Sequence, residues 1–143
     1  MIFAERYHDI SCGHRVFGHE SKCAHLHGHN YRIHFKVSMI EGDTDSIGRV
    51  MDFSVIKEKL CMWLESNWDH KFLIWARDPW ADPLFQLDRK GIVEVPFNPT
   101  AENMAHYLLV EIGPKQLTGT GVSLASVKVE ETRKCSASSE LFV

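Results

Sequence analysis

The stretch HNYRIHFKVSM, residues 29–39, alternates strictly between two sets of side chains. One set falls on a single face and consists of His29, Tyr31, Ile33, Phe35, Val37 and Met39. The intervening positions are all polar or charged. A period of two residues is typical of a β-strand with one buried face, because successive side chains in a strand point to opposite sides. This segment therefore predicts a half-buried strand.

Further strands are predicted on either side of it. The full set of predicted strands is 2–14, 29–39, RVMDF (49–53), IVEVP (92–96) and ASVKVEET (125–132). The loop 15–26 would join the first two as neighbours, and the turn formers in EGDTDSIG would lead to the third. Two Asp-Pro steps make residues 71–91 a predicted long loop.

Two helices are predicted between these strands. The first covers residues 53–67, with Asp52 or Ser54 as its N-cap. The second begins at Thr100 and stops at Gly113, which a proline follows. The resulting order, β-β-β-α-β-α-β, favours an α+β domain with both helices on one face of an antiparallel sheet.

The composition indicates an ordinary globular protein. A chain of 143 residues is most simply one domain, 1–143, that buries its own core. A net charge of −3 gives no basic footprint for nucleic acid, and no apolar run suits a membrane span or a signal peptide. We therefore expect a cytoplasmic protein without membrane or nucleic-acid partners. The four irregularly spaced cysteines favour free thiols over a disulfide framework.

Histidine is the residue that points to chemistry, since seven of the nine histidines lie within the first 34 positions. His27 and His29 flank Gly28, so in a strand both side chains face the same way and can reach one ion. His14 ends the first predicted strand and would lie beside them if the two strands pair. Three histidines with a fourth position open form a catalytic zinc arrangement, whereas structural zinc normally has four protein ligands.

Cys23 allows two interpretations from its position alone. It precedes His27 by four residues, so it could be the fourth ligand of a structural zinc. Alternatively, the loop could hold the thiol near the metal without coordination, where a thiolate could act as a base. The local sequence does not separate these two roles.

Two further groups could contribute. Asp69 and His70 follow the first predicted helix, and a carboxylate that orients an imidazole next to a thiol is the logic of an activated Cys/His pair. Such a pair is also common as a polar helix end. Glu131 shares the face of Val127 and Val129, where a carboxylate could accept two N–H groups from a guanidine-like ligand edge. The strand could equally end before Glu131 and leave it solvated.

In combination these motifs resemble the 6-pyruvoyltetrahydropterin synthase superfamily. The matching elements are His14, Cys-x-x-x-His-x-His, Asp-His, Pro-Thr-x-Glu-Asn and Val-x-Val-x-Glu-Thr, in the family's order from about residue 3 to 133. The three residues between the cysteine and His-x-His look like the bacterial 6-carboxytetrahydropterin synthase branch of the queuosine and 7-deazaguanine pathway. Two segments depart from the family pattern: Cys12, where small residues are usual, and the longer 71–98 segment, an expected rim loop.

The resemblance implies a role for each matching residue. His14, His27 and His29 would bind Zn²⁺, with Cys23 as the nearby catalytic thiol. Asp69 and His70 would form a proton relay, and Glu131 would anchor the pterin. Pieces of the pterin pocket would come from Thr132, Thr100 and Glu102. The triphosphate would need cations, for which Arg15, Lys22 and Lys36 are candidates. The implied architecture is the tunnelling fold (T-fold), in which subunits pool their sheets into a barrel as trimers or hexamers and share active sites.

The implied activity converts 7,8-dihydroneopterin triphosphate to 6-carboxy-5,6,7,8-tetrahydropterin, acetaldehyde and triphosphate. Two alternatives stay open. One is a 6-pyruvoyltetrahydropterin synthase, which eliminates triphosphate without carbon–carbon cleavage. The other is a non-catalytic zinc-stabilised binding module with Cys23 as fourth ligand. The pathway's end product is not fixed by the sequence.

Overall fold

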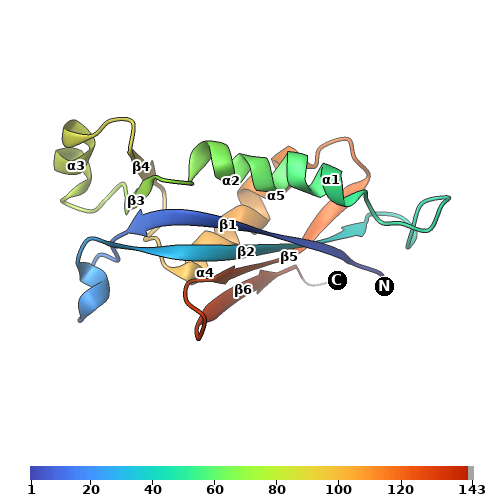
Figure 1. The fold of residues 1–143 in the computed structure, drawn as a ribbon, viewed down its shortest axis with the longest axis horizontal. Helices are drawn as coiled ribbons and strands as arrows, with labels where there is room; N and C mark the ends of the chain where they lie inside the picture. The colour runs from blue at the N-terminus through green and yellow to red at the C-terminus, as the bar shows by residue number, and fades with distance from the viewer. Residues whose placement is uncertain (142–143) are drawn as a thin grey trace.

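The computed structural model describes residues 1–141 and shows one six-stranded sheet with helices over one of its faces (Figure 1). The strands are β1 Ala4–His14, β2 His27–Met39, β3 Phe72–Trp75, β4 Ile92–Val95, β5 Val122–Glu130 and β6 Ser136–Glu140. Their order in the sheet is β4-β3-β1-β2-β5-β6. The α+β class is confirmed. The sheet is mixed rather than purely antiparallel, because β3 pairs in parallel with both β1 and β4.

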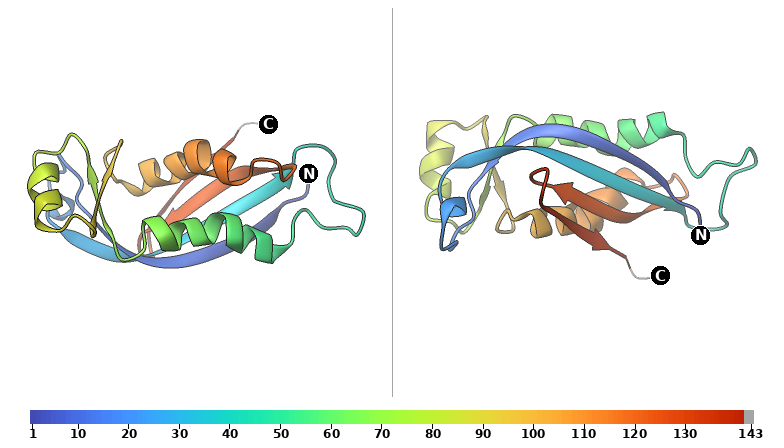
Figure 2. Two further views of the ribbon diagram at one scale, coloured as in Figure 1. Left: turned by 90° about the horizontal axis from the view of Figure 1, so that it is seen from above. Right: turned by 60° about the horizontal axis from the view of Figure 1, so that its bottom comes forward.

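The β1–β2 hairpin contains the two longest strands of the sheet, and β2 shows the predicted alternation of buried and exposed side chains. Tyr31, Ile33, Phe35 and Val37 are all buried, and they face the core that the helices cover. The other face of β1 and β2 carries mostly polar side chains. Helices lie behind this face and do not cover it in the view from below (Figure 2). The sheet therefore separates an apolar, helix-covered face from a polar, open face.

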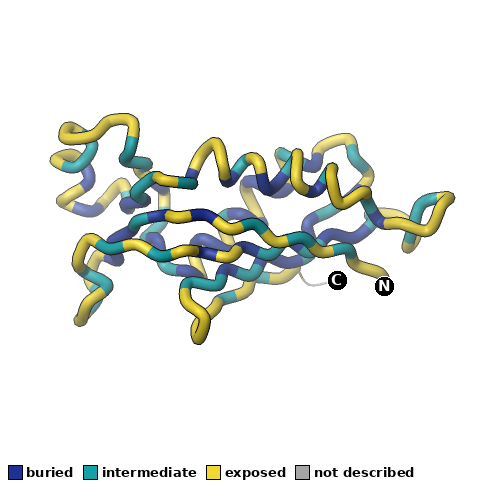
Figure 3. Tube along the Cα trace, in the orientation of Figure 1, coloured by how far each residue is buried: buried dark blue, intermediate teal, exposed yellow. Residues whose placement is uncertain are grey.

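Two long helical segments cover the apolar face. The first joins α1 Phe53–Ile56, the π turn η2 Lys57–Cys61 and α2 Met62–Asn67. The second joins α4 Ala101–Tyr107, the π turn η3 Leu108–Ile112 and α5 Gly113–Gln116. Asp52, rather than Ser54, caps the first by accepting from Ser54 N, and Thr100 caps the second by accepting from Asn103 N. The buried stripe runs along the helix sides that face the sheet (Figure 3).

Three local predictions were wrong. RVMDF forms no strand, because β1 and β5 already pair with both edges of β2. The predicted 71–91 loop contains β3 and the helix α3 Ala81–Leu87, whose Pro83 lies in the first turn, where a missing N–H is tolerated. Gly113 does not end its helix: a side chain there would meet Leu124 at 2.4 Å, so the glycine serves close packing.

Strand β6 was not predicted, because its sequence SASSE has no apolar alternation. It pairs with β5 and forms one edge of the sheet, while β4 forms the other. Within residues 1–141, no helix combines the length and apolar character that a membrane crossing requires.

Candidate metal centre and active site

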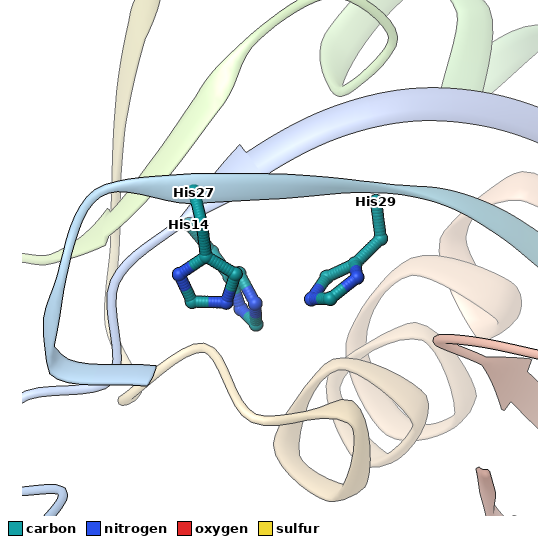
Figure 4. A group of neighbouring side chains, drawn as sticks. All are labelled: His14, His27 and His29. Atoms are coloured by element: carbon teal, nitrogen blue, oxygen red, sulfur yellow. The ribbon is translucent and has the colours of Figure 1, made fainter. Parts of the chain in front are cut away.

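Three histidines meet at the end of the β1–β2 hairpin, on the helix-covered face of the sheet. The hairpin register pairs His14 with His27 and Cys12 with His29, so the four side chains share one face. One nitrogen from each of His14, His27 and His29 lies within 4.8 Å of the other two. Figure 4 shows the three rings turned toward a common space, two from β2 and one from β1.

Backbone carbonyls fix how two of these rings present their nitrogens. His14 Nδ1 lies 2.7 Å from the oxygen of Pro99, and His27 Nδ1 lies 2.7 Å from the oxygen of His25. A carbonyl oxygen can only accept, so each Nδ1 carries the proton and each Nε2 presents a lone pair. Metal-binding histidines usually donate their second nitrogen to a carbonyl or carboxylate in this way.

Burial favours the neutral form of the cluster. It lowers the pKa of the His14 imidazole to about 4, and it also lowers the pKa of His29. Among the described residues, the Nε2 atoms of both are buried and have no hydrogen-bond partner. Buried polar atoms without a partner are rare, and three imidazole nitrogens facing one point match the donor set that zinc prefers. The residues present therefore fit a zinc ion.

Glu131 follows β5 and points to the same space. Its Oε1 lies 3.3 Å from His14 Nε2 and 3.5 Å from His29 Nε2, without the angles of a hydrogen bond. The turn behind it is tied by Cys135, whose carbonyl accepts from the N–H groups of Glu131 and Thr132. The carboxylate is therefore held beside the histidines and is only partly buried.

Cys23 lies in the loop between β1 and β2, within the short 3-10 turn η1 Lys22–Ala24. Its side chain is partly exposed, and its carbonyl accepts from Val16 N at 2.8 Å. Within the described chain, its sulfur does not belong to the group of mutually close ligand atoms that the three histidines form. The loop thus carries a free, partly exposed thiol four residues before His27.

Asp69 and His70 lie at the edge of β1, where the His70 N–H donates to the oxygen of Ser11 at 2.7 Å. Asp69 Oδ1 accepts from Ser11 N at 2.9 Å, and its Oδ2 lies 2.9 Å from His70 Nδ1. His70 has a positive φ of 59° and an exposed ring. Both residues line a hollow of about 660 Å³ together with Asn30 and Arg32, whose side chains are on the open face. The pair is therefore pre-formed at the edge of β1, and neither residue belongs to the group of close ligand atoms that the three histidines form.

The remaining predicted residues lie in several different parts of the structure. Thr100 is partly buried as the cap of α4, and Glu102 is exposed in the first turn. Thr132 lines the open-face hollow, and its Oγ1 accepts from Lys134 N and Cys135 N. Of the three candidate cations for triphosphate, Arg15 is buried in an ion pair with Asp78, whereas Lys22 is exposed and Lys36 is partly exposed.

The structure adds two residues at the cluster that the sequence did not single out. Pro99 supplies the carbonyl that orients His14, and no side-chain pattern could have indicated a backbone acceptor. Tyr31 packs edge-on against His14 and His29, with ring centroids 5.8 and 5.5 Å away. Burial raises the pKa of its hydroxyl, and the Glu131 carboxylate and nearby cysteine thiols raise it further.

Cys12 proves to be a core residue rather than a second reactive thiol. Its side chain is buried, and its sulfur lies 3.5 Å from the oxygen of Gly13. Burial raises the pKa of this thiol to about 12, with a smaller contribution from the charge of Asp69. It therefore stays protonated at neutral pH.

Comparison with known proteins points in one direction. Residues 4–141 match the family model described as 6-pyruvoyl tetrahydropterin synthase. The chain is 34% identical over 136 residues to the 6-carboxy-5,6,7,8-tetrahydropterin synthase of Rickettsia felis, covering 94% of this chain and 97% of that protein. A probable 6-carboxy-5,6,7,8-tetrahydropterin synthase of Halobacterium salinarum is also 34% identical, over 86% of this chain and 76% of that protein.

Solved structures show the same fold. The uncharacterized protein WS1659 of Wolinella succinogenes aligns with a TM-score of 0.81 at 25% identity, covering 96% of this chain and 97% of that one. The 6-pyruvoyl tetrahydropterin synthase of Caenorhabditis elegans aligns with a TM-score of 0.69 at 22% identity, covering 99% and 96%.

Proposed function

Since this chain belongs to the 6-pyruvoyl tetrahydropterin synthase family, we propose that it is a 6-carboxy-5,6,7,8-tetrahydropterin synthase. Its substrate would be 7,8-dihydroneopterin triphosphate, and its products 6-carboxytetrahydropterin, acetaldehyde and triphosphate. The single observation that carries the proposal is the cluster of His14, His27 and His29 beside a loop with a free thiol. Relatives named 6-carboxy-5,6,7,8-tetrahydropterin synthase support this choice of reaction. The pathway it would serve is that of queuosine and other 7-deazaguanines.

The three histidines would hold Zn²⁺ through one ring nitrogen each, and burial lowers the pKa of His14 and His29 toward the neutral form that binds metal. Bound zinc would act as a Lewis acid on the side-chain hydroxyls of the substrate and make the adjacent C–H protons easier to remove. The carbonyls of Pro99 and His25 orient two of the ligands, so the site is arranged in advance.

Cys23 would be the base that moves those protons at the substrate side chain. It lies in the loop that leads into His27, the first residue of β2, and its sulfur lies outside the group of close ligand atoms. A base that is near the metal and not bound to it keeps its lone pair for the substrate. The binding-module alternative requires Cys23 as a ligand, and the geometry gives it no support.

Glu131 would fix the pterin ring by accepting two N–H groups from its guanidine-like edge. Its carboxylate faces the histidine cluster from the turn that follows β5. A pterin ring held there would have its side chain over the metal. Thr132, Thr100 and Glu102 would form parts of the pocket wall. Holding the reacting carbon in place is itself a large contribution to rate.

Asp69 and His70 would serve the site of a neighbouring subunit. They line the hollow that opens on the polar face, Cys23 is not among its lining residues, and the Asp69 carboxylate already orients the His70 ring. The sheet ends in the short edge strands β4 and β6, which could pair with other copies as T-fold subunits do in a trimeric or hexameric barrel. The proton relay would then be completed only by assembly.

Product analysis tests this proposal. Incubation of the zinc-loaded protein with 7,8-dihydroneopterin triphosphate should release acetaldehyde and triphosphate in equal amounts. Triphosphate release with a pyruvoyl product and no acetaldehyde would instead identify a 6-pyruvoyltetrahydropterin synthase. No consumption of the substrate by the assembled, zinc-loaded protein would overturn the proposal.

A further inference from the structure

The loop that carries Cys23 has few anchors of its own. It leaves β1 at Arg15 and returns at His27, and its turn η1 contains no buried residue. Besides the bonds within its own turn and two bonds between Phe17 and Asn98, two hydrogen bonds tie the peptides around the thiol to residues 15 and 16. Val16 N donates to the oxygen of Cys23 at 2.8 Å, and Arg15 Nη1 donates to the oxygen of Ala24 at 3.1 Å. The position of Cys23 therefore depends in part on where the Arg15 side chain is held.

Arg15 is held by the segment that connects β3 to α3. Its Nε donates to Asp78 Oδ2 at 2.7 Å, and both residues are buried. The Trp80 ring covers the guanidinium, with Cζ 3.4 Å from the ring centroid. A buried guanidinium needs such a counter-charge, because an unpaired charge in the interior is costly.

Asp78 is itself fixed at the start of α3. Its Oδ1 accepts from Trp80 N at 2.9 Å, its N–H donates to the oxygen of Trp75, and its carbonyl accepts from Ala81 N. Trp75 ends β3, and β3 pairs with β1 at His14. The 76–81 segment therefore bridges rigidly between the strand end that carries His14 and the loop that carries Cys23.

We propose that Arg15, Asp78 and Trp80 form a clamp that positions Cys23 relative to the three histidines. The clamp gives the 71–98 segment a defined task, in place of the rim loop expected from the sequence. The effect of the clamp on turnover rests on the proposed function, whereas its restraint on the thiol exists without substrate. Arg15 is thereby a positioning residue and not a ligand of the triphosphate.

Asp78→Asn is the decisive variant, because it can keep the acceptor for Trp80 N while it removes both the charge and the acceptor oxygen that Arg15 Nε uses. Asp45→Asn is a matched control: Asp45 Oδ2 accepts from Arg49 Nε at the same 2.7 Å, and its Oδ1 accepts from backbone N–H groups. This control pair lies in the loop between β2 and α1, at the opposite end of the molecule from α3 (Figure 1).

Thiol labelling reads the restraint directly. A Cys135→Ser background leaves Cys23 as the accessible cysteine, since Cys12 and Cys61 are buried. In the zinc-loaded protein we expect Asp78→Asn to raise the iodoacetamide labelling rate of Cys23 on the order of tenfold, equivalent to about 1.4 kcal/mol of lost local restraint. Cys12 and Cys61 should stay unlabelled, which separates local loosening from unfolding. Asp45→Asn should match the parent protein.

Kinetics provide the second readout. A displaced base slows the chemical step more than it weakens substrate binding. Asp78→Asn should therefore lower kcat on the order of 10- to 100-fold and leave KM and zinc content nearly unchanged. If Asp78→Asn does not fold, Trp80→Leu, which keeps the ion pair and uncovers it, should shift both readouts in the same direction by less. Cys23 labelling equal to the Asp45→Asn control, in whichever of these variants folds, would overturn the clamp. If the wild type is inactive toward the pterin while Asp78→Asn still labels faster than its parent, only the proposed function is overturned.

Discussion

His14 Nδ1 donates a hydrogen bond of 2.7 Å to the carbonyl oxygen of Pro99, and this contact aims His14 Nε2 at His27 and His29. The contact joins the end of β1 to the residue just before the cap of α4, 85 positions later in the chain. A helix that covers the sheet thus also sets the protonated nitrogen of a metal ligand.

Loss of this ligand should remove the metal. We expect His14→Gln to lower zinc affinity by at least about 100-fold, since even indirect supports of metal ligands are worth 10- to 100-fold. Zinc retained after dialysis against a weak chelator would be measured by mass spectrometry. His25→Ala is the matched control, because His25 contributes only its backbone carbonyl to His27 and that carbonyl persists. Equal zinc in the two variants would contradict a three-histidine centre.

Glu131→Gln should separate substrate binding from metal binding. If Glu131 anchors the pterin, the variant keeps its zinc and binds the substrate more weakly by about 10- to 100-fold, the cost of losing a charged acceptor. Calorimetric titration with a pterin and metal analysis would be run on the same preparation. Because Glu131 Oε1 lies 3.3 Å from His14 Nε2, a variant that loses its zinc would show instead that the carboxylate is a ligand.

Much of the fold and of the site could be predicted because their signals are local. The alternation in β2 and the caps Asp52 and Thr100 act over a few residues, and the structure confirms these elements. The strand RVMDF failed because sheet pairing is a long-range property, decided by which edges remain free. Likewise, the hairpin register brings the three histidines together, whereas the face occupied by Asp69 and His70 depends on how α2 meets β1.

A mixing experiment tests whether subunits share a site. Cys23→Ala and His70→Ala should each be nearly inactive alone. After the two are unfolded, mixed and reassembled with zinc, activity should return, because some sites would combine Cys23 from one chain with His70 from another. The comparison is with each variant reassembled alone. If the mixture stays as inactive as its parents, the relay pair does not act across subunits.

Cys12 should be dispensable for the reaction and contribute only to the core. Cys12→Ala should keep zinc and activity and cost about 1 kcal/mol of unfolding free energy. Burial raises the native pKa of this thiol from 9.0 to about 12, so the unfolded chain loses the proton first as the pH rises. The stability advantage of the wild type over Cys12→Ala is therefore complete below pH 9 and declines between pH 9 and 12. Urea unfolding at pH 8 and pH 10.5 would reveal it, and a constant difference would contradict a buried thiol.

Cys23→Ala, with zinc content and product release measured on one preparation, tests the central claim most directly. The proposed function predicts that this variant folds, keeps the zinc content of the wild type and loses turnover by about 10²- to 10⁴-fold, the usual contribution of a catalytic base. Loss of zinc and of stability together would contradict it, because Cys23 would then be a fourth metal ligand.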